Sequence, residues 1–449
     1  MASTMFDSDL FRDMFGTREM REVFSDQGYL ACCLEAEAAL ARAQASVGMI
    51  PAAAAEEITR RAVIGNLDFD QLRQECEVVG YPILGLVRQV AAACDGDAGG
   101  YVHWGATTQD IMDTAVILQL RQALDLVAAD LEACADLLRT LAVRHRDVPM
   151  AGRTHLQHAL PITFGFKAAI WRDPLVRHLQ RLAQLRPRVL TGQFGGAAGT
   201  LASLGAGGLA VRAALMKELG LREPEITWHV SRDSLAEAVL FTGLVTGSLA
   251  KIGTDMMLMM ATEFAEAFEP YQHGRGASST MPQKRNPISS ELIVASAKVV
   301  RQQCALMLDA SVHDFERATG PWHAEWVAIP QSFIATSGAL AQTRLMLAGL
   351  TIDAERMERN LNLTGGLIVT EAVMMGLAPA IGRQKAHDVV YDACREVAVG
   401  GRTLLQVLAA DPAVSSHFSE AQLQDLLEPK NYLGSAGLMV DRAVAVQPG

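Results

Sequence analysis

Apolar residues recur every three or four positions over long stretches of the chain, a spacing that aligns them along one side of an α-helix. Within residues 114–144 the recurring positions are Val116, Leu120, Leu124, Val127, Leu131, Cys134, Leu138 and Leu141. Residues 234–268 repeat the pattern, and both stretches are rich in residues that favour helices. We therefore predict two very long helices, the second with about 35 residues and a length of about 50 Å at the usual rise per residue.

The spacing of proline supports a chain of long helices, because proline breaks helix interiors. The prolines leave long gaps at 83–148, 188–223, 225–269, 288–320 and 331–378. Few stretches alternate apolar and polar residues as strands do, so the expected fold class is all-α. The predicted helices are apolar on more than one side and must be buried on several sides, which predicts a homo-oligomer.

Segments richer in proline and glycine separate the predicted helices and indicate three helical domains. An N-terminal helical domain is expected over residues 1–105, and a C-terminal one over residues 353–449. Between them, residues 106–352 would form a central bundle of long helices. The candidate functional segments described below all lie in this bundle or at its start.

Half of the 449 residues are apolar and the formal charge is 39 − 50 = −11, values typical of a folded and acidic protein. An acidic protein lacks the basic surface needed for general binding of nucleic acids or membranes, so neither partner is expected. The seven cysteines show no C-x-x-C or Cys/His spacing, and no metal or other cofactor is predicted. The start shows no signal-peptide pattern, and the apolar stretch at 238–250 is too short to span a membrane, so a cytoplasmic protein is expected.

Residues 269–291 form the segment richest in candidate chemistry. Gly274 and Gly276 give it a flexible entry, and Pro282 and Pro287 stiffen its exit. The polar residues between them are Ser278, Ser279, Thr280, Lys284, Arg285 and Asn286. Such a dense set of hydroxyl, cationic and amide groups between two predicted helices indicates an anion-binding or catalytic loop, with an ordinary connection as the alternative.

Three segments of the chain resemble the conserved regions of one enzyme family. Residues 276–287 read G-A-S-S-T-M-P-Q-K-R-N-P, and they follow V-H-W-G-A-T-T-Q-D-I-M-D at 102–113 and G-R-T-H-L-Q-H-A-L-P-I-T-F-G at 152–165. In this order they resemble the fumarase/aspartase superfamily, which includes adenylosuccinate lyase, argininosuccinate lyase and 3-carboxy-cis,cis-muconate cycloisomerase. The resemblance extends over nearly the whole chain and is strongest to the bacterial cycloisomerase branch.

The resemblance implies β-elimination or addition on a small polycarboxylate through an aci-carboxylate intermediate. Ser278 would be the catalytic base that removes a proton next to a carboxylate. Lys284, also among the implied catalytic residues, and Asn286 would bind that carboxylate, with Ser279 in support. Donors held in place around the carboxylate matter most, because the intermediate carries an additional negative charge there.

In the second region the resemblance makes His155 a general acid or a group that orients the substrate. Its partner would be Glu291, whose carboxylate fixes the tautomer of the imidazole. Arg153, Thr154 and Gln157 would contact the substrate. A structural histidine remains the lesser alternative for His155, and a metal site at the H-x-x-H pair has no evident third ligand.

In the first region the implied substrate-binding residues are His103, Thr107 and Thr108. The two threonines open a predicted long helix, whose free N–H groups can bind a substrate carboxylate. Helix capping alone is also a sufficient reason for threonines at this place. Arg232 matches the arginine region through which the family contacts its substrate. Four further residues between predicted helices have no assigned role: Arg317, Trp322, His323 and Glu325.

The favoured activity is that of a lyase or cycloisomerase that closes 3-carboxy-cis,cis-muconate to a lactone in aromatic catabolism. The nearest alternative is a C–N lyase or epimerase acting on an N-substituted aspartate. This alternative stays open because the chain retains the His155–Glu291 pair, which some bacterial cycloisomerases lack. Gly80, Tyr81 and Pro82 stand where adenylosuccinate lyases carry a further histidine, which counts against a nucleotide substrate.

A non-catalytic structural protein on the same scaffold is the second alternative. The family also implies a homotetramer with a twenty-helix core and active sites shared between subunits. An acidic protein that acts on an acidic small molecule needs a local cluster of cationic groups and helix N-termini at its binding site. The resemblance implies that this cluster lies where the three conserved regions come together in the active site.

Overall fold

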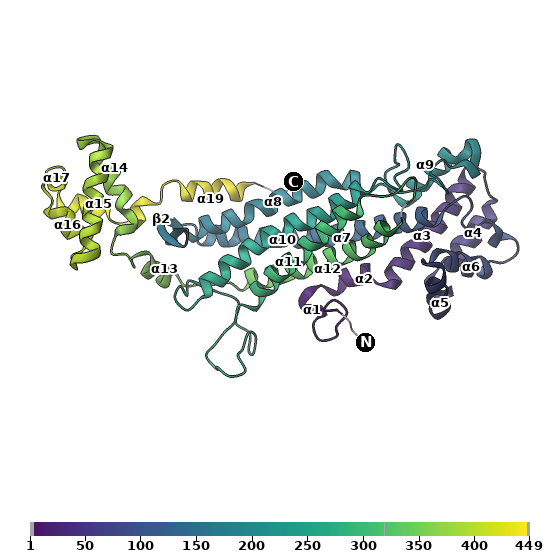
Figure 1. The fold of residues 1–449 in the computed structure, drawn as a ribbon, viewed down its shortest axis with the longest axis horizontal. Coiled ribbons are helices and arrows are strands. Elements are labelled where there is room, and N and C mark those ends of the chain that lie inside the picture. Colours follow the sequence, from purple (N-terminus) through teal and green to yellow (C-terminus); the bar gives the residue numbers. More distant parts are fainter. Residues whose placement is uncertain (1–3, 318, 447–449) are drawn as a thin grey trace. The chain divides into compact units, whose positions relative to one another are not determined.

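The computed structural model describes residues 4–317 and 319–446, and most regular structure in them is helical (Figure 1). This confirms the predicted all-α class. The described residues also contain four short β-strands, which the sequence did not predict and which form two separate two-stranded sheets. Two compact units make up the chain. Unit 1 contains Met1–Leu131, His178–Leu249 and Leu292–Ala341, and unit 2 contains Glu132–Arg177, Ala250–Glu291 and Gln342–Gly449.

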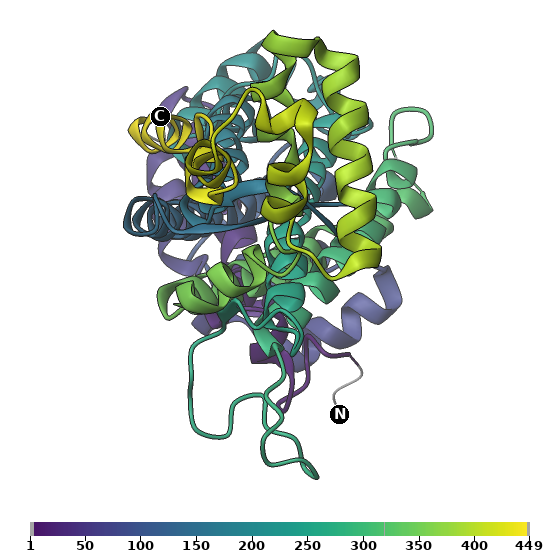
Figure 2. The same cartoon turned by 90° about the vertical axis from the view of Figure 1, so that its left-hand side faces the viewer.

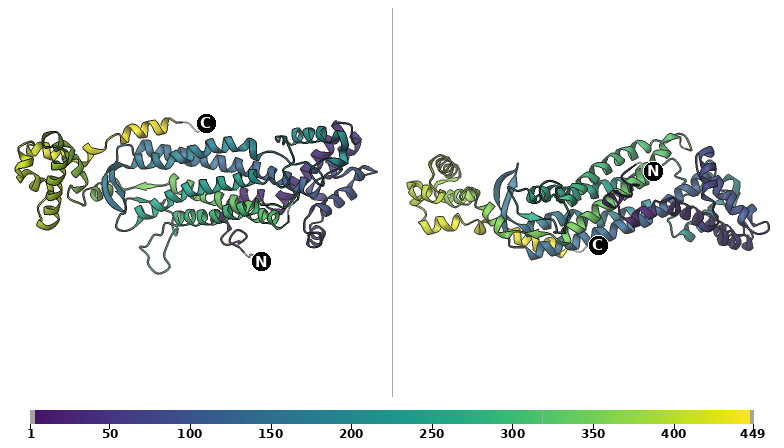
Figure 3. Two further views of the ribbon diagram at one scale, coloured as in Figure 1. Left: turned by 45° about the horizontal axis from the view of Figure 1, so that its top comes forward. Right: turned by 90° about the horizontal axis from the view of Figure 1, so that it is seen from below.

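Long helices dominate the chain, and their segments within unit 1 run side by side (Figure 3). They are α7 (Thr108–Arg144), α8 (Phe164–Val189), α10 (Asp233–Met260), α11 (Ile288–Ala310) and α12 (Gly320–Ala348). The helix predicted within 114–144 is confirmed as part of α7. Leu118 lies on a different side of α7 from Leu120 and Leu124, and each of the three is at most 2% exposed. The broad apolar surface of this helix is therefore buried largely within the single chain.

The helix predicted over 234–268 is shorter than expected, because α10 ends at Met260 and Ala267–Phe268 form strand β3, which pairs with β4 (Thr351–Ile352). The apolar spacing continues past Met260, but the side chain of Glu266 is fully buried and accepts hydrogen bonds from two other segments. A buried carboxylate needs such donors. This tertiary requirement overrides the local helix propensity.

Helix α10 has the length and apolar composition of a membrane span, the one such helix in the part of the chain that the structure describes. The sequence pattern had suggested a shorter apolar stretch. Of the most apolar 18-residue window, 61% is buried in the protein. Buried core helices of large proteins have the same all-round apolar character.

The remaining helices of unit 1 are shorter, and α3 packs against α4 and α9. They are α1 (Arg12–Phe15), α2 (Arg18–Val23), α3 (Asp26–Ser46), α4 (Ala52–Arg61), α5 (Phe69–Val79), α6 (Ile83–Ala93) and α9 (Gly208–Leu219). The side chains of Thr17 and Ser25 cap α2 and α3 by accepting hydrogen bonds from backbone N–H groups. The predicted boundary at residue 105 lies just before α7.

Unit 2 contains a β-hairpin made of β1 (Pro149–Thr154) and β2 (Gln157–Thr163). The C-terminal helices α14 to α18 surround a core that includes Leu377, Leu404 and Leu423, and they lie together in Figure 1. The C-terminal helices are α13 (Ala354–Leu361), α14 (Thr370–Ile381), α15 (Arg383–Gly400), α16 (Leu404–Ala410), α17 (Pro412–Ser415), α18 (Glu420–Leu426) and α19 (Ala436–Ala445). The predicted boundary at 353 lies just before α13, and the division into three domains stays a prediction.

Candidate functional site

The segment between β3 and α11 is a long loop with little regular structure, drawn at the lower edge of Figures 1 and 2. The backbone N–H of Asn286 donates to the carbonyl of Gly276 at 2.9 Å and closes the base of the loop. Gly276 has a φ of 70°, and a Cβ there would lie 2.4 Å from the carbonyl oxygen of Asn286. This close approach requires glycine. The contact between Gly276 and Asn286 holds the two ends of the loop side by side, one leading to Ser278 and the other following Lys284.

Ser278 lies within this loop and is partly buried. Its Oγ accepts hydrogen bonds from the backbone N–H groups of Met281, at 3.0 Å, and Thr280, at 3.3 Å. Ser279 and Lys284 are exposed on the same loop. The loop thus presents a hydroxyl oxygen that already faces two donors, with an ammonium group available nearby in the chain.

The ends of the loop are anchored in unit 2 by the buried carboxylate of Glu269. This carboxylate accepts hydrogen bonds from the backbone N–H groups of Ser289 and Ser290 at the start of α11, at 3.1 and 2.8 Å. Arg285 donates to the backbone carbonyl of Glu269. Glu291 follows in the first turn of α11 and is exposed. The anchored ends and the exposed middle suit a segment that can move over a substrate.

His155 lies at the turn of the β-hairpin, and its side chain is exposed. His155 and Leu156 both have positive φ, 53° and 61°, between the paired residues Thr154 and Gln157. Two residues with positive φ make the tight hairpin turn that usually carries Asn-Gly or Asp-Gly. Backbone strain in residues other than glycine is concentrated at functional sites. The hairpin thereby presents Thr154, His155 and Gln157 together on one exposed turn.

Arg153 is held inside unit 2 beneath this turn. Its guanidinium pairs with the buried carboxylate of Glu266 through two contacts of 2.6 and 3.0 Å, and it lies 4.8 Å from the ring centre of Phe264. Asn360 donates to the same carboxylate at 2.9 Å. These contacts anchor the hairpin and favour a structural role for Arg153 over the predicted contact with substrate.

The predicted partners His155 and Glu291 both lie in unit 2. Among the described residues, the structure records no hydrogen bond or ion pair between the two side chains of this single chain. Both side chains are exposed, so each is accessible to a further molecule. Their pairing stays a prediction.

In unit 1, the first conserved region forms the start of α7. The backbone N–H of Thr107 donates to Asp110 at 3.0 Å, and the Thr107 hydroxyl accepts from the guanidinium of Arg317. Arg317 also donates to the carbonyl of Ala197 at 3.3 Å. Thr108 begins the helix itself. The structure thus adds Arg317, to which the sequence assigned no role, to the groups at this helix start.

His103 lies in the same region with a φ of 62°, and its Nδ1 is 2.6 Å from the fully buried carboxylate of Glu37. Burial alone lowers the pKa of His103, but the charge of Glu37 and its hydrogen bond outweigh burial and raise the pKa above its usual value. The imidazole therefore holds its proton more firmly than a free histidine. The pairing with Glu37 thus favours the protonated form of an imidazole four residues before Thr107.

We expect the His103→Gln variant to lose the most stability below about pH 6.5, the usual pKa of histidine. A histidine with a raised pKa in the folded state contributes stability that is fully present below the unfolded-state pKa and that is lost as the pH rises through the folded-state pKa. Melting temperatures of the wild type and the variant, measured from pH 5.5 to 8.5, should converge as the pH increases. A difference that is constant over this range would contradict the ion pair.

Arg232 is 2% exposed and is enclosed by two carboxylates of unit 1. It donates to both oxygens of Asp113, at 2.7 and 2.9 Å, and to both oxygens of Glu325, at 2.8 and 2.5 Å. The indole Nε1 of Trp322 also contacts Asp113, at 3.3 Å. This geometry favours a structural role for Arg232 over the predicted substrate contact. It also assigns Trp322 and Glu325 to the same buried cluster, whereas His323 packs against Trp326.

In the part of the chain that the structure describes, no arrangement of side chains suggests a metal site. No group of three or more His, Cys, Asp or Glu side chains lies close enough together there to hold an ion. The candidate residues of unit 1 and of unit 2 are acids, bases and hydrogen-bond donors.

Comparison with known families decides the assignment. Residues 15–301, more than half of the chain, match a family model described as lyase, and residues 366–443 match one described as adenylosuccinate lyase C-terminus. The chain belongs to the fumarase/aspartase superfamily. It is a lyase or cycloisomerase of that superfamily.

Similar superfamily members cover nearly the whole chain. A 3-carboxy-cis,cis-muconate cycloisomerase from Pseudomonas aeruginosa is 47% identical over 98% of this chain and 96% of the relative. Trans-aconitate decarboxylase 1 from Mycosarcoma maydis is 49% identical over 96% of this chain and 88% of the relative. The crystal structure of a 3-carboxy-cis,cis-muconate lactonizing enzyme from Pseudomonas putida matches with a TM-score of 0.92, at 43% identity and 98% coverage of both chains.

The three conserved regions of this superfamily member belong to two different units. The helix start with His103, Thr107 and Thr108 lies in unit 1, and the hairpin turn and the loop with Ser278 lie in unit 2. Sequence reasoning missed Asp110 and His229, two buried residues that bond to each other beside the helix start. No local signal marks His229, which is 119 residues away from Asp110.

Proposed function

We propose that this protein catalyses addition or elimination at the carbon β to a carboxylate of a small polycarboxylate, through an aci-carboxylate intermediate. The leading reaction is the closure of 3-carboxy-cis,cis-muconate to a lactone, a step of aromatic catabolism. The observation that carries this proposal is the exposed loop with Ser278, Lys284 and Asn286, in a chain that is 47% identical over nearly its full length to a cycloisomerase.

In the proposed mechanism Ser278 removes or delivers the proton on the carbon next to a carboxylate. The N–H groups of Met281 and Thr280 face its oxygen and stabilise negative charge there. Lys284 and Asn286 bind the carboxylate as its charge grows. Closure of the loop would exclude water from the intermediate. His155 and Glu291 would assist proton transfer on the opposite side of the substrate.

A second candidate is the decarboxylation of an unsaturated tricarboxylate. It is favoured by the 49% identity to trans-aconitate decarboxylase 1. Both candidate substrates are small unsaturated acids with three carboxylates, so the same cationic and hydroxyl groups suit either. The reactions differ in product, because decarboxylation releases carbon dioxide and lactonisation releases nothing.

A substrate panel separates these candidates. We expect the purified protein to consume 3-carboxy-cis,cis-muconate at least about tenfold faster, by kcat/KM, than trans-aconitate, a difference of about 1.4 kcal/mol in transition-state stabilisation. Loss of the diene is followed by absorbance, and carbon dioxide release is measured in parallel. Argininosuccinate tests the C–N lyase alternative. Turnover of trans-aconitate alone, with release of carbon dioxide, would replace the first proposal with the second.

We also propose that the protein is a cytoplasmic homotetramer in which each active site combines residues from different subunits. Membership of the superfamily supports this arrangement, because the family resemblance implies a homotetramer with shared active sites. Mixed oligomers test it, because a Ser278→Ala chain and a Thr108→Val chain, each inactive alone, should regain activity when refolded together. A monomer by sedimentation, or mixtures without activity, would contradict shared sites.

A further inference from the structure

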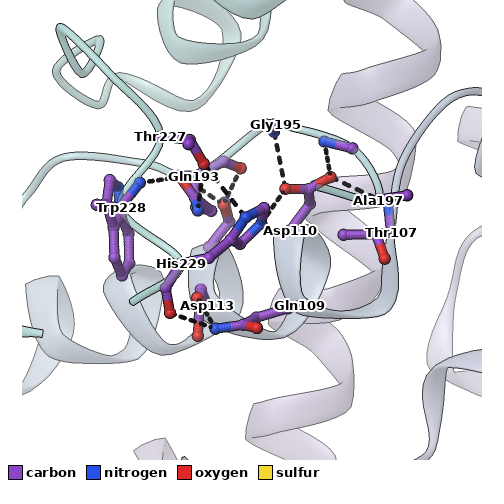
Figure 4. Close-up of polar contacts among 12 residues, drawn as sticks. Thr107, Gln109, Asp110, Asp113, Gln193, Gly195, Ala197, Thr227, Trp228 and His229 are labelled. Atoms are coloured by element: carbon purple, nitrogen blue, oxygen red, sulfur yellow. Dashed lines mark hydrogen bonds and ion pairs between the residues drawn. The ribbon is translucent and has the colours of Figure 1, made fainter. Parts of the chain in front are cut away.

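The carboxylate of Asp110 connects three segments of unit 1 beside the start of α7 (Figure 4). The side chain is fully buried. It accepts hydrogen bonds from the backbone N–H groups of Gly195, at 2.8 Å, Gly196, at 2.9 Å, and Thr107, at 3.0 Å. The Nε2 of His229 lies 2.8 Å from the same carboxylate. One side chain thereby holds the helix start, the turn at Gly195–Gly196 and the segment that carries His229.

The orientation of the His229 ring follows from its two neighbours. The side chain is 1% exposed, and its Nδ1 lies 3.2 Å from the hydroxyl of Thr227. That hydroxyl also accepts a hydrogen bond from the amide of Gln193 at 3.1 Å, which holds it beside Nδ1. The network therefore orients the ring with Nε2 toward the carboxylate of Asp110, an acceptor to which an N–H at Nε2 donates.

Glycines make this arrangement sterically possible. A Cβ at Gly195 would lie 2.6 Å from the Thr227 hydroxyl and 3.1 Å from the imidazole carbon Cε1 of His229. A Cβ at Gly199 would lie 2.5 Å from the methyl group of Thr227. The turn at 195–199 and the segment at 227–229 are therefore in direct contact, and displacement of one displaces the other.

We propose that Asp110 and His229 form a positioning pair, which holds Thr107 and the turn at Gly195–Ala197 in the geometry that receives a substrate carboxylate. The pair rests on the proposed function, since Thr107 and Thr108 are the groups expected to bind that carboxylate. Arg317 contacts both Thr107 and the carbonyl of Ala197, so both of its contacts depend on the geometry that the pair maintains. Asp110 and His229 are buried and do not touch the substrate themselves.

The test compares two substitutions of His229, to Leu and to Gln, with a Leu substitution at a second buried histidine. Gln can place an N–H where Nε2 stands, whereas Leu has a similar volume and no donor. We expect His229→Leu to raise KM about 10- to 100-fold, with a smaller change in kcat, because an error of about 1 Å in a binding group is enough for such an effect. His229→Gln should restore KM to within about threefold of the wild type, because it retains the donor.

His178 supplies the control, because it is also buried in unit 1 and its Nε2 lies 2.9 Å from the hydroxyl of Ser248. His178→Leu should lower the melting temperature and leave KM unchanged. If His229→Leu does not fold, Thr227→Val carries the test, since it removes only the hydroxyl that orients His229. It should shift KM in the same direction by a smaller factor.

Hydrogen–deuterium exchange gives a readout that does not depend on activity. His229→Leu should accelerate exchange of the Gly195 and Gly196 amides, and His178→Leu should not. If His229→Leu accelerates exchange of these amides but leaves KM unchanged, the pair does not position the substrate-binding groups. If exchange is also unchanged, Asp110 and His229 do not hold the turn, and the proposal is wrong. Absence of turnover by the wild type on every polycarboxylate would reject the proposed function instead, and the exchange result would still decide whether the pair holds the turn.

Discussion

Replacement of Ser278 with alanine is expected to lower kcat by about 10²- to 10⁴-fold, the usual contribution of a positioned acid or base. A serine hydroxyl is a weak base at neutral pH, so it must be activated by its surroundings. In the structure two backbone N–H groups already face its oxygen, at 3.0 and 3.3 Å. The substitution removes the oxygen and leaves these donors in place. KM should change little, because Lys284 and Asn286 still bind the carboxylate.

Thr280 provides the matched control for this experiment. It carries a hydroxyl on the same loop, two residues later, and is exposed. Thr280→Ala should retain the kcat of the wild type, which separates loss of the base from a general disturbance of the loop. Single-turnover measurements on the substrate identified by the panel isolate the chemical step. Full turnover by Ser278→Ala would remove this residue from the mechanism.

The helices were predictable because their cause is local. Apolar residues at helical spacing and the absence of proline act within a few turns of one segment, and α7 contains the predicted stretch. The hairpin at 149–163 was not predictable in this way. Its strands contain glycine, histidine and two prolines, and its turn uses His155 and Leu156 at positive φ. Its residue Arg153 is held by Glu266, 113 residues away in the chain, and Asn360 donates to the same Glu266 carboxylate.

The candidate site shows the same division between local and distant causes. Serine, lysine and asparagine in one short loop were recognisable from the sequence, because the loop and its chemistry are contiguous. The two arginines were different. A cation near a conserved motif looks the same in sequence whether its partner is a substrate carboxylate or a protein carboxylate. Arg153 and Arg232 both have buried protein partners, Glu266 for the first and Asp113 with Glu325 for the second.

This distinction predicts a large loss of stability when Arg232 is replaced with methionine. The substitution leaves two buried carboxylates without their cation, a change that costs about 3–5 kcal/mol of folding free energy when a buried pair is broken. Burial alone raises the pKa of Glu325, and the hydrogen bond and charge of Arg232, together with His313, reverse that effect and lower it. Thermal and denaturant unfolding of the purified variant measure the loss.

Two further variants identify the cause of the stability loss expected for Arg232→Met. Arg212 pairs at 3.1 Å with the half-exposed carboxylate of Glu223 in the same unit, which water can still solvate after the substitution, so Arg212→Met should cost clearly less stability than Arg232→Met. The triple variant Asp113→Asn, Arg232→Met, Glu325→Gln removes the buried charges together and should regain most of the lost stability. A contact with substrate would behave in the opposite way. If Arg232→Met were as stable as the wild type and bound polycarboxylates poorly, Arg232 would belong to the substrate-binding residues, and the two carboxylates around it would have to be neutralised by some other group.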